Sequence, residues 1–360
     1  MKQTISLKLE PTSEQYQSLL RTMEAFNRGC QYVADIAYEK RIANKVKIQP
    51  IVYSELRTRF GLSSQMAVRA ISKAIEAYKR DKRVHCKFDL HGAMIYDQRI
   101  MSFKGLTHVS LLTLTGRERI PIRFGAYQSA RMDRIQGQAD LILRNGVFYL
   151  YVTVDIPTPP PIEPEGVLGV DLGIVEIATD SEGNSYSGEV VKAYRRKIRR
   201  FRGLLQSKGT KSAKRHLKRI AKKQSRYIRD INHQISKKIV ETASRSAKAL
   251  ALENLKGIRD RSNGFSREMR WLMGNWSFYQ LAQFISYKAE QAGIPMVFVD
   301  PRNTSRTCSV CGYVDKANRK SQAHFKCLQC GFEINADYNA AKNIEARAAQ
   351  STSLLLQPSG

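Results

Sequence analysis

The chain has 360 residues, enough for two or three domains that each bury a core, so its fold does not require disulfide bonds. Its 60 lysines and arginines against 32 aspartates and glutamates leave a net charge of +28, and such self-repulsion predicts a polyanionic partner. If the charge serves binding, nucleic acid is the expected partner. Each contact of a lysine or arginine with a phosphate releases counterions, and this release favours binding. Charge kept for solubility is the alternative.

A membrane or secreted protein is not expected. The apolar stretches are shorter than a membrane span, and the first residues lack the apolar core of a secretion signal. We therefore expect a cytoplasmic protein.

The first 155 residues change their hydrophobic period along the chain. Residues 2–9 alternate as a strand does, and helical spacing follows from about Ser13 to Arg41 and from Ile51 to Lys79. From about Val84 to Asp155 the residues alternate again, with Gly and Asn between the runs. This order predicts a small helical unit followed by short antiparallel strands that could form a barrel.

A proline-rich connector at residues 157–164 marks a domain boundary, because it is unsuited to the interior of a helix or sheet. Beyond it, buried strands alternate with helices, which predicts an α/β domain. Residues 351–360 are expected to form a loose tail.

A local field of positive charge follows the connector. From Lys192 to Arg229 there are seventeen lysines and arginines and no acidic residue. Residues 211–239 have apolar side chains three to four apart, which predicts an amphipathic helix with one packed and one cationic face. That cationic face either contacts nucleic acid or is simply solvated. The candidate contacts are Arg195, Arg199, Lys214, Arg215, Lys218 and Lys222.

Three carboxylates lie in unusual surroundings. Asp171 is in an apolar run between Gly169 and Gly173, Glu253 ends a second apolar run, and Asp337 begins an Ala-rich helix. Burial of an ionised carboxylate is costly unless a charge, a metal or hydrogen bonds compensate it. Taken singly, Asp171 could cap a turn and Asp337 a helix. Taken together, they supply the oxygen ligands that Mg²⁺ prefers.

Four cysteines have the spacing of a zinc site. Two Cys-x-x-Cys pairs are separated by fifteen residues, and each pair is followed by glycine; the cysteines are Cys308, Cys311, Cys327 and Cys330. Four thiolates close the coordination sphere of Zn²⁺, so this ion is expected to stabilise the fold and not to catalyse. A zinc deaminase is excluded because no histidine is followed two residues later by Glu.

The sequence around the three acids resembles the RuvC-like core of the TnpB family and of the related type V CRISPR effectors. The similar segments are residues 169–173, 252–255 and 336–344. The resemblance implies a multidomain α+β protein, with an RNase H-like (RuvC) α/β nuclease domain, an inserted four-cysteine zinc ribbon, and a preceding β-barrel-like wedge domain that contains a helical recognition insertion.

The resemblance also gives domain boundaries. The expected parts are a wedge-like domain at 1–10 and 84–160, a recognition domain at 11–83, a RuvC-like domain at 161–304 and 333–350, a ribbon at 305–332, and a tail at 351–360.

The function implied by this resemblance is that of a transposon-associated, RNA-guided DNA endonuclease from a prokaryote, working in the cytoplasm at the nucleoid. Asp171, Glu253 and Asp337 would hold two Mg²⁺ or Mn²⁺ ions and be the catalytic residues. The partners would be a guide RNA and double-stranded target DNA, and the protein a monomer. Arg306, in a lead-in to the ribbon that also resembles the family, would place positive charge near the scissile phosphate, or be an ordinary surface residue.

Three alternatives remain open. The chain could be a guide-dependent DNA-binding regulator without nuclease activity, or a RuvC-like nuclease that needs no guide. A transposase shares the metal chemistry, and the resemblance disfavours it. Aromatic residues at 265–279 could stack on bases, although Phe278 and Tyr279 are better explained by packing of a helix.

Overall fold

The computed structural model describes residues 1–255, 278–321 and 323–355. It divides into two compact units, Met1–Pro157 and Thr158–Gly360, and the division falls where the proline-rich connector begins. In these ranges, no helix combines the length and the apolar character needed to cross a bilayer. The aromatic residues at 265–276 lie outside the described part of the chain.

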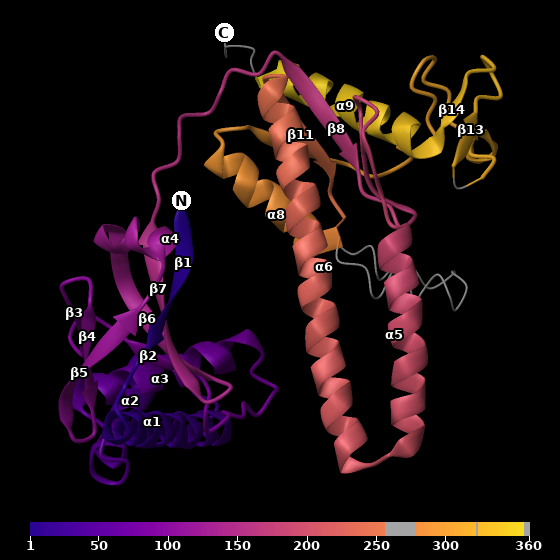
Figure 1. Cartoon of the computed structure of the whole chain (residues 1–360). Helices are drawn as coiled ribbons and strands as arrows, with labels where there is room; N and C mark the ends of the chain where they lie inside the picture. The colour runs from indigo at the N-terminus through magenta and orange to yellow at the C-terminus, as the bar shows by residue number, and fades with distance from the viewer. Residues whose placement is uncertain (256–277, 322, 356–360) are drawn as a thin grey trace. The chain divides into compact units, whose positions relative to one another are not determined.

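The first unit contains a barrel-like antiparallel sheet of seven strands, in the order β2-β6-β7-β1-β5-β4-β3 (Figure 1). The strands are β1 (Lys2–Leu9), β2 (Met94–Tyr96), β3 (Met101–Lys104), β4 (His108–Thr113), β5 (Gly116–Arg123), β6 (Ile135–Arg144) and β7 (Val147–Asp155). Strand β1 pairs with β7 and with β5. A short helix α4 (Ala126–Ser129) and a 3₁₀ turn η1 (Met132–Arg134) precede β6.

Three helices lie between β1 and β2 in the chain: α1 (Ser13–Glu39), α2 (Lys45–Thr58) and α3 (Ser64–Arg80). The helical spacing from Ile51 to Lys79 covers the second half of α2 and most of α3, with a break between them. Asn44 caps α2 and Ser63 caps α3, and Gly61 between these two helices has a φ of 64°. A glycine in this left-handed conformation ends a helix at little cost. A capping box at Thr12 begins α1.

The second unit contains a five-stranded sheet in the order β10-β9-β8-β11-β12. The strands are β8 (Gly166–Asp171), β9 (Glu176–Asp180), β10 (Ser185–Ser187), β11 (Lys248–Glu253) and β12 (Met296–Val299). Strands β8, β11 and β12 are parallel, whereas β9 and β10 are antiparallel additions. Strands β8 and β11 are apolar and largely buried, as is typical of strands covered on both faces, whereas the edge strand β12 is partly exposed at Phe298.

Helices cover the two faces of this sheet. Leu168, Val170, Leu250 and Leu252 pack with residues of α5 (Glu189–Lys208), α6 (Lys211–Arg245) and α8 (Phe278–Gln291). The alternate positions Val167, Ala249 and Ala251 pack with Ile344 and Ala348 of α9 (Ala336–Leu355). Because side chains alternate along a strand, Asp171 and Glu253 belong to the face that α9 covers. Helices α5 and α6 lie side by side as a hairpin (Figure 1).

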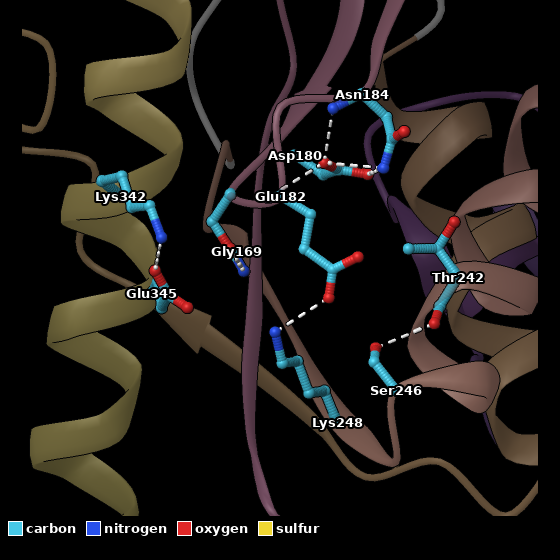
Figure 2. Close-up of polar contacts among 10 residues, drawn as sticks. Gly169, Asp180, Glu182, Asn184, Thr242, Ser246, Lys248, Lys342 and Glu345 are labelled. Carbon is cyan, nitrogen blue, oxygen red and sulfur yellow. Dashed lines mark hydrogen bonds and ion pairs between the residues drawn. The ribbon is translucent and has the colours of Figure 1, made fainter.

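Gly169 is the point at which α9 lies closest to β8. A Cβ atom at this position would lie 2.3 Å from Ala341 O and 2.5 Å from Glu345 N. Figure 2 shows Gly169 facing the turn of α9 that carries Lys342 and Glu345, which form an ion pair. The absence of a side chain at Gly169 therefore allows the helix backbone to rest on the strand.

The cysteine-containing segment precedes α9. It contains a 3₁₀ turn η3 (Lys316–Asn318) and a short hairpin of β13 (His324–Lys326) and β14 (Glu333–Asn335). Helix α9 continues to Leu355, so the prediction of a loose tail from Ser351 is wrong for residues 351–355.

Candidate functional site

Two of the three acids end neighbouring parallel strands. Strands β8 and β11 are in register from Lys248 opposite Gly166 to Leu252 opposite Val170. Asp171 and Glu253 follow these last partners, so they emerge together at the carboxyl edge of the sheet. Both are partly exposed at this edge.

Asp337 reaches the same region from the first turn of α9, and 5% of it is exposed. It does not cap this helix. The side chain of Asn335 does so, accepting hydrogen bonds from the backbone amides of Asp337 at 2.9 Å and Tyr338 at 3.1 Å. The carboxylate of Asp337 is thus left to other partners.

The three carboxyl groups interact electrostatically. Burial raises the pKa of Asp171 well above its ordinary value, and the negative charges of Glu253 and Asp337 raise it further, against the opposing charge of Arg319. Burial also raises the pKa of Glu253 and of Asp337. A divalent cation would relieve both the burial and the repulsion, and carboxylate oxygens are the donors that Mg²⁺ prefers.

Two polar residues that sequence reasoning did not assign to the site contact these acids. The guanidinium of Arg319, between η3 and β13, donates to Asp337 Oδ1 at 3.0 Å. The hydroxyl of Thr304, which is 2% exposed, donates to Glu253 Oε1. Nothing in the sequence distinguished Arg319 from the neighbouring basic residues, because its contact depends on how the hairpin folds back toward α9.

Helix α9 also holds the segment that carries Thr304. The side-chain amide of Asn343 donates to Thr304 O at 2.8 Å and to Thr307 O at 2.7 Å. Asn339 donates to Thr307 O and accepts from the amide of Ser309. The helix therefore positions Asp337 directly and Glu253 through Thr304.

The four predicted cysteines converge, with all Sγ atoms within 4.8 Å of one another. The Sγ atoms of Cys308 and Cys330 are 3.7 Å apart, and those of Cys311 and Cys327 are 3.5 Å apart. Tetrahedral Zn²⁺ with bonds of about 2.3 Å would separate its sulfurs by about 3.8 Å. The cluster therefore fits a zinc ion.

The two halves of the cysteine cluster have the same backbone turn. Cys308 N donates to Tyr313 O and Gly312 N to Cys308 O, and the corresponding bonds recur at Cys327 and Gly331. Gly312 and Gly331 have φ of 76° and 72°. This left-handed conformation favours glycine and explains its presence after each cysteine pair.

Replacement of a zinc ligand should unfold this segment. We expect Cys327→Ser to lower zinc content from roughly one ion per chain toward none and to reduce thermal stability. Elemental analysis and thermal melts test this result. Cys86→Ser, a thiol outside the cluster, is the matched control, and full zinc content in Cys327→Ser would contradict the ligand assignment.

The raised pKa of Asp171 predicts how stability depends on pH without Mg²⁺. A carboxyl whose pKa is higher in the folded than in the unfolded chain binds more protons in the folded chain. The free energy of unfolding therefore falls as pH rises from the pKa of the unfolded chain to that of the folded chain. We expect Asp171→Asn to raise the melting temperature at neutral pH by a few degrees, since about 1 kcal/mol corresponds to roughly 2–4 °C.

This gain in melting temperature should shrink as pH falls toward the ordinary pKa of aspartate, about 3.9. Thermal melts of zinc-loaded protein across pH, without Mg²⁺, measure it. A variant less stable than the wild type at neutral pH would show that Asp171 has adequate partners without a metal.

The predicted basic contacts differ in exposure. Arg199, Lys214, Arg215, Lys218, Lys222 and Arg306 are exposed. Arg195 is 2% exposed, because it lies one turn after the buried Val191 on the inward face of α5, and burial lowers its pKa to about 10. The prediction of a surface contact is wrong for Arg195. At the start of α8, Phe278 is buried, whereas Tyr279 is 73% exposed and does not pack as expected.

Comparisons with known proteins match the segments that contain the three acids. Residues 150–259 match the family model described as a probable transposase, and residues 278–344 match the Cas12f1-like TNB domain. A CRISPR-associated endodeoxyribonuclease Cas12f1 of Syntrophomonas palmitatica is 30% identical over an alignment of 245 residues, which covers 55% of this chain and 48% of that protein. The putative RNA-guided DNA endonuclease InsQ of Escherichia coli is 38% identical over 69 residues, 19% of this chain and 17% of that protein.

The fold of the chain agrees as well. A Cas12f1 chain from the cryo-EM structure of a Cas12f1-sgRNA-target DNA complex matches with a TM-score of 0.66 and 14% identity, over 96% of this chain and 98% of that one. The sequence matches span about half or less of the two curated relatives. The resemblance to TnpB proteins and type V effectors is therefore confirmed.

Proposed function

We propose, from this relationship to the TnpB and Cas12f proteins, that the chain is a transposon-associated, RNA-guided DNA endonuclease. Asp171, Glu253 and Asp337 would bind two Mg²⁺ ions and act as its catalytic residues. The observation that supports this proposal is the electrostatic coupling of Asp171 to both other acids, which reach it from a parallel strand and from the covering helix.

Each neighbouring residue has a defined part in this mechanism. Bound Mg²⁺ ions would activate a water molecule and stabilise the departing oxygen of the phosphodiester. Thr304 orients Glu253 through its hydroxyl. Arg319 places a guanidinium beside Asp337, where it offsets the carboxylate charges and can donate to a phosphate oxygen.

The zinc ribbon would support this site through Arg319. The backbone of Arg319 forms a β-bridge with Phe325, which is fully buried and packs with Cys308 and Cys327. The ribbon thus joins the cysteine cluster to the cation that contacts Asp337. A structural Zn²⁺ would therefore hold Arg319 in place without taking part in hydrolysis.

The proposed partners are a guide RNA and double-stranded target DNA. The exposed lysines and arginines of α5 and α6 provide a cationic surface for a phosphate backbone. In RNA-guided recognition, base pairing reads the sequence while the protein reads backbone shape and a short adjacent motif. In this proposal the first unit is the wedge-like domain with its helical recognition insertion, and the protein is a cytoplasmic monomer.

The guide requirement is tested by sequencing RNA that copurifies with the protein and programming that RNA against a plasmid. We expect a discrete RNA and Mg²⁺-dependent cleavage only of the matched plasmid. Equal cleavage of unmatched or branched DNA without RNA would establish the guide-independent nuclease. Guide-dependent binding without cleavage would establish the regulator, and joined ends would establish a transposase.

Loss of Arg319 should reduce cleavage. We expect Arg319→Ala to slow guide-directed cleavage by about 10²-fold, the scale for removing one donor to a developing charge. Arg319→Lys should cleave faster than Arg319→Ala because it keeps the positive charge. It should remain slower than the wild type because lysine lacks the planar fork of donors. Single-turnover rates measure both variants. The control is Lys320→Ala, an adjacent exposed cation, and equal rates for the two alanine variants would remove Arg319 from the mechanism.

A further inference from the structure

A small pocket lies beside Asp171 and Asp337 and has no part in the mechanism described so far. Its volume is 290 Å³, and it is lined by Thr179, Gly183, Ser185, Asn335 and Tyr338. Thr179 on β9 is the direct cross-strand partner of Asp171, and Tyr338 follows Asp337 in α9. A group bound in this pocket would therefore be next to any phosphate held at the acids.

The walls of the pocket are fixed by hydrogen bonds. The carboxylate of Asp180, which is fully buried, accepts from the amides of Glu182 and Asn184 and from the Asn184 side chain, so it holds the turn that contains Gly183 (Figure 2). Lys248 of β11 pairs with Glu182 at 2.8 Å in the same turn (Figure 2). Opposite this turn, Asn335 caps the first turn of α9. The pocket is thus preformed.

The charge around the pocket limits what it can bind. All five lining residues are uncharged. Glu176 accepts from Ser185 Oγ at 2.7 Å, and its negative charge also raises the pKa of Asp337. These carboxylates repel a phosphate, and Lys342, whose Nζ lies 5.8 Å from the centroid of the Tyr338 ring, offsets only part of that repulsion because it also pairs with Glu345. A neutral group meets no such repulsion. The ring of Tyr338 offers a flat face, and the hydroxyls of Thr179 and Ser185 offer polar contacts.

We propose that this pocket binds the base of the nucleotide next to the scissile phosphate, with Tyr338 stacked against it. This inference rests on the proposed nuclease function. Aromatic side chains bind bases of any sequence by stacking, which suits an enzyme whose sequence specificity comes from a guide. Tyr338 is then a substrate-binding residue that orients the strand for cleavage at the acids.

The experiment uses the full chain with its guide and target strands that carry one abasic nucleotide at successive positions around the cut. We expect the wild type to slow by about five- to a hundredfold at one position beside the cut. Tyr338→Leu should slow cleavage of intact DNA by a similar factor, with little further loss on that abasic strand. Tyr338→Phe, which keeps the ring, should cleave at nearly the wild-type rate.

A second measurement does not depend on cleavage. The Asp171→Asn variant is bound to guide and to DNA that carries 2-aminopurine at the sensitive position beside the cut. We expect the fluorescence of 2-aminopurine to be quenched in this complex and restored in the double variant that also carries Tyr338→Leu. Two results would overturn the pocket assignment alone. In one, an active wild type cleaves strands with an abasic nucleotide at every tested position at the same rate. In the other, Tyr338→Leu slows cleavage of the abasic strand by the same factor as it slows cleavage of intact DNA. A wild type that cleaves no substrate, with unquenched 2-aminopurine, would overturn both proposals.

Discussion

Asp171→Asn is expected to reduce guide-directed DNA cleavage by about a thousandfold or more. The amide keeps the shape of the side chain and removes the negative charge that a divalent ion requires. Metal ions contribute several kcal/mol to stabilising the charge of a transition state, and each 1.4 kcal/mol corresponds to a factor of about ten. Single-turnover cleavage of a matched plasmid, with protein in excess, measures the rate.

The matched control is Asp230→Asn, an exposed aspartate in α6. It should cleave at the wild-type rate, and both variants should retain guide RNA and bind target DNA. This separates a defect in chemistry from a defect in assembly. Equal products from Asp171→Asn and wild type would remove the three acids from the mechanism.

Gly169→Ala is expected to destabilise the second unit strongly, although it adds a single methyl group. The new carbon would lie 2.3 Å and 2.5 Å from backbone atoms of α9, and backbone cannot move aside as the end of a side chain can. Overpacking of this kind costs about 1–3 kcal/mol or more. Because α9 carries Asp337, we also expect cleavage to fall well below what the loss of folded protein explains.

Gly203→Ala is the control for this substitution. Gly203 lies within α5, and its added Cβ would meet nothing within 4 Å. Alanine there should stabilise the helix by about 0.5–1 kcal/mol, so the same chemical change has opposite effects at the two sites. Thermal melts and single-turnover rates compare them. Wild-type stability of Gly169→Ala would show that α9 can move away from β8.

Strand periodicity and local motifs made much of the second unit predictable. Asp171 and Glu253 end apolar runs, and such runs become buried parallel strands whose carboxyl ends meet. The paired Cys-x-x-Cys turns determine their own backbone geometry through the glycines that follow them. These features depend on neighbours within a few residues, and such neighbours are visible in the sequence.

Features that depend on tertiary packing were not predictable in the same way. The helical spacing from Ile51 to Lys79 did not by itself locate the break between α2 and α3, which lies at Gly61 and Ser63. Arg195 was predicted to contact nucleic acid as a member of the basic run, while its position one turn from Val191 directs it inward. The contact of Arg319 with Asp337 joins the ribbon to α9, and no spacing rule indicates which of several basic residues makes it.

The location of the divalent ions tests the central claim most directly. The wild-type protein, with all three acids intact, can be crystallised with its guide RNA, target DNA and Mn²⁺. Anomalous scattering from these crystals then locates the manganese ions. We predict two manganese peaks about 3.5–4 Å apart, held by carboxylate oxygens of these three residues. Manganese bound at other side chains in a complex that still cleaves DNA, with no peak at these acids, would contradict the account.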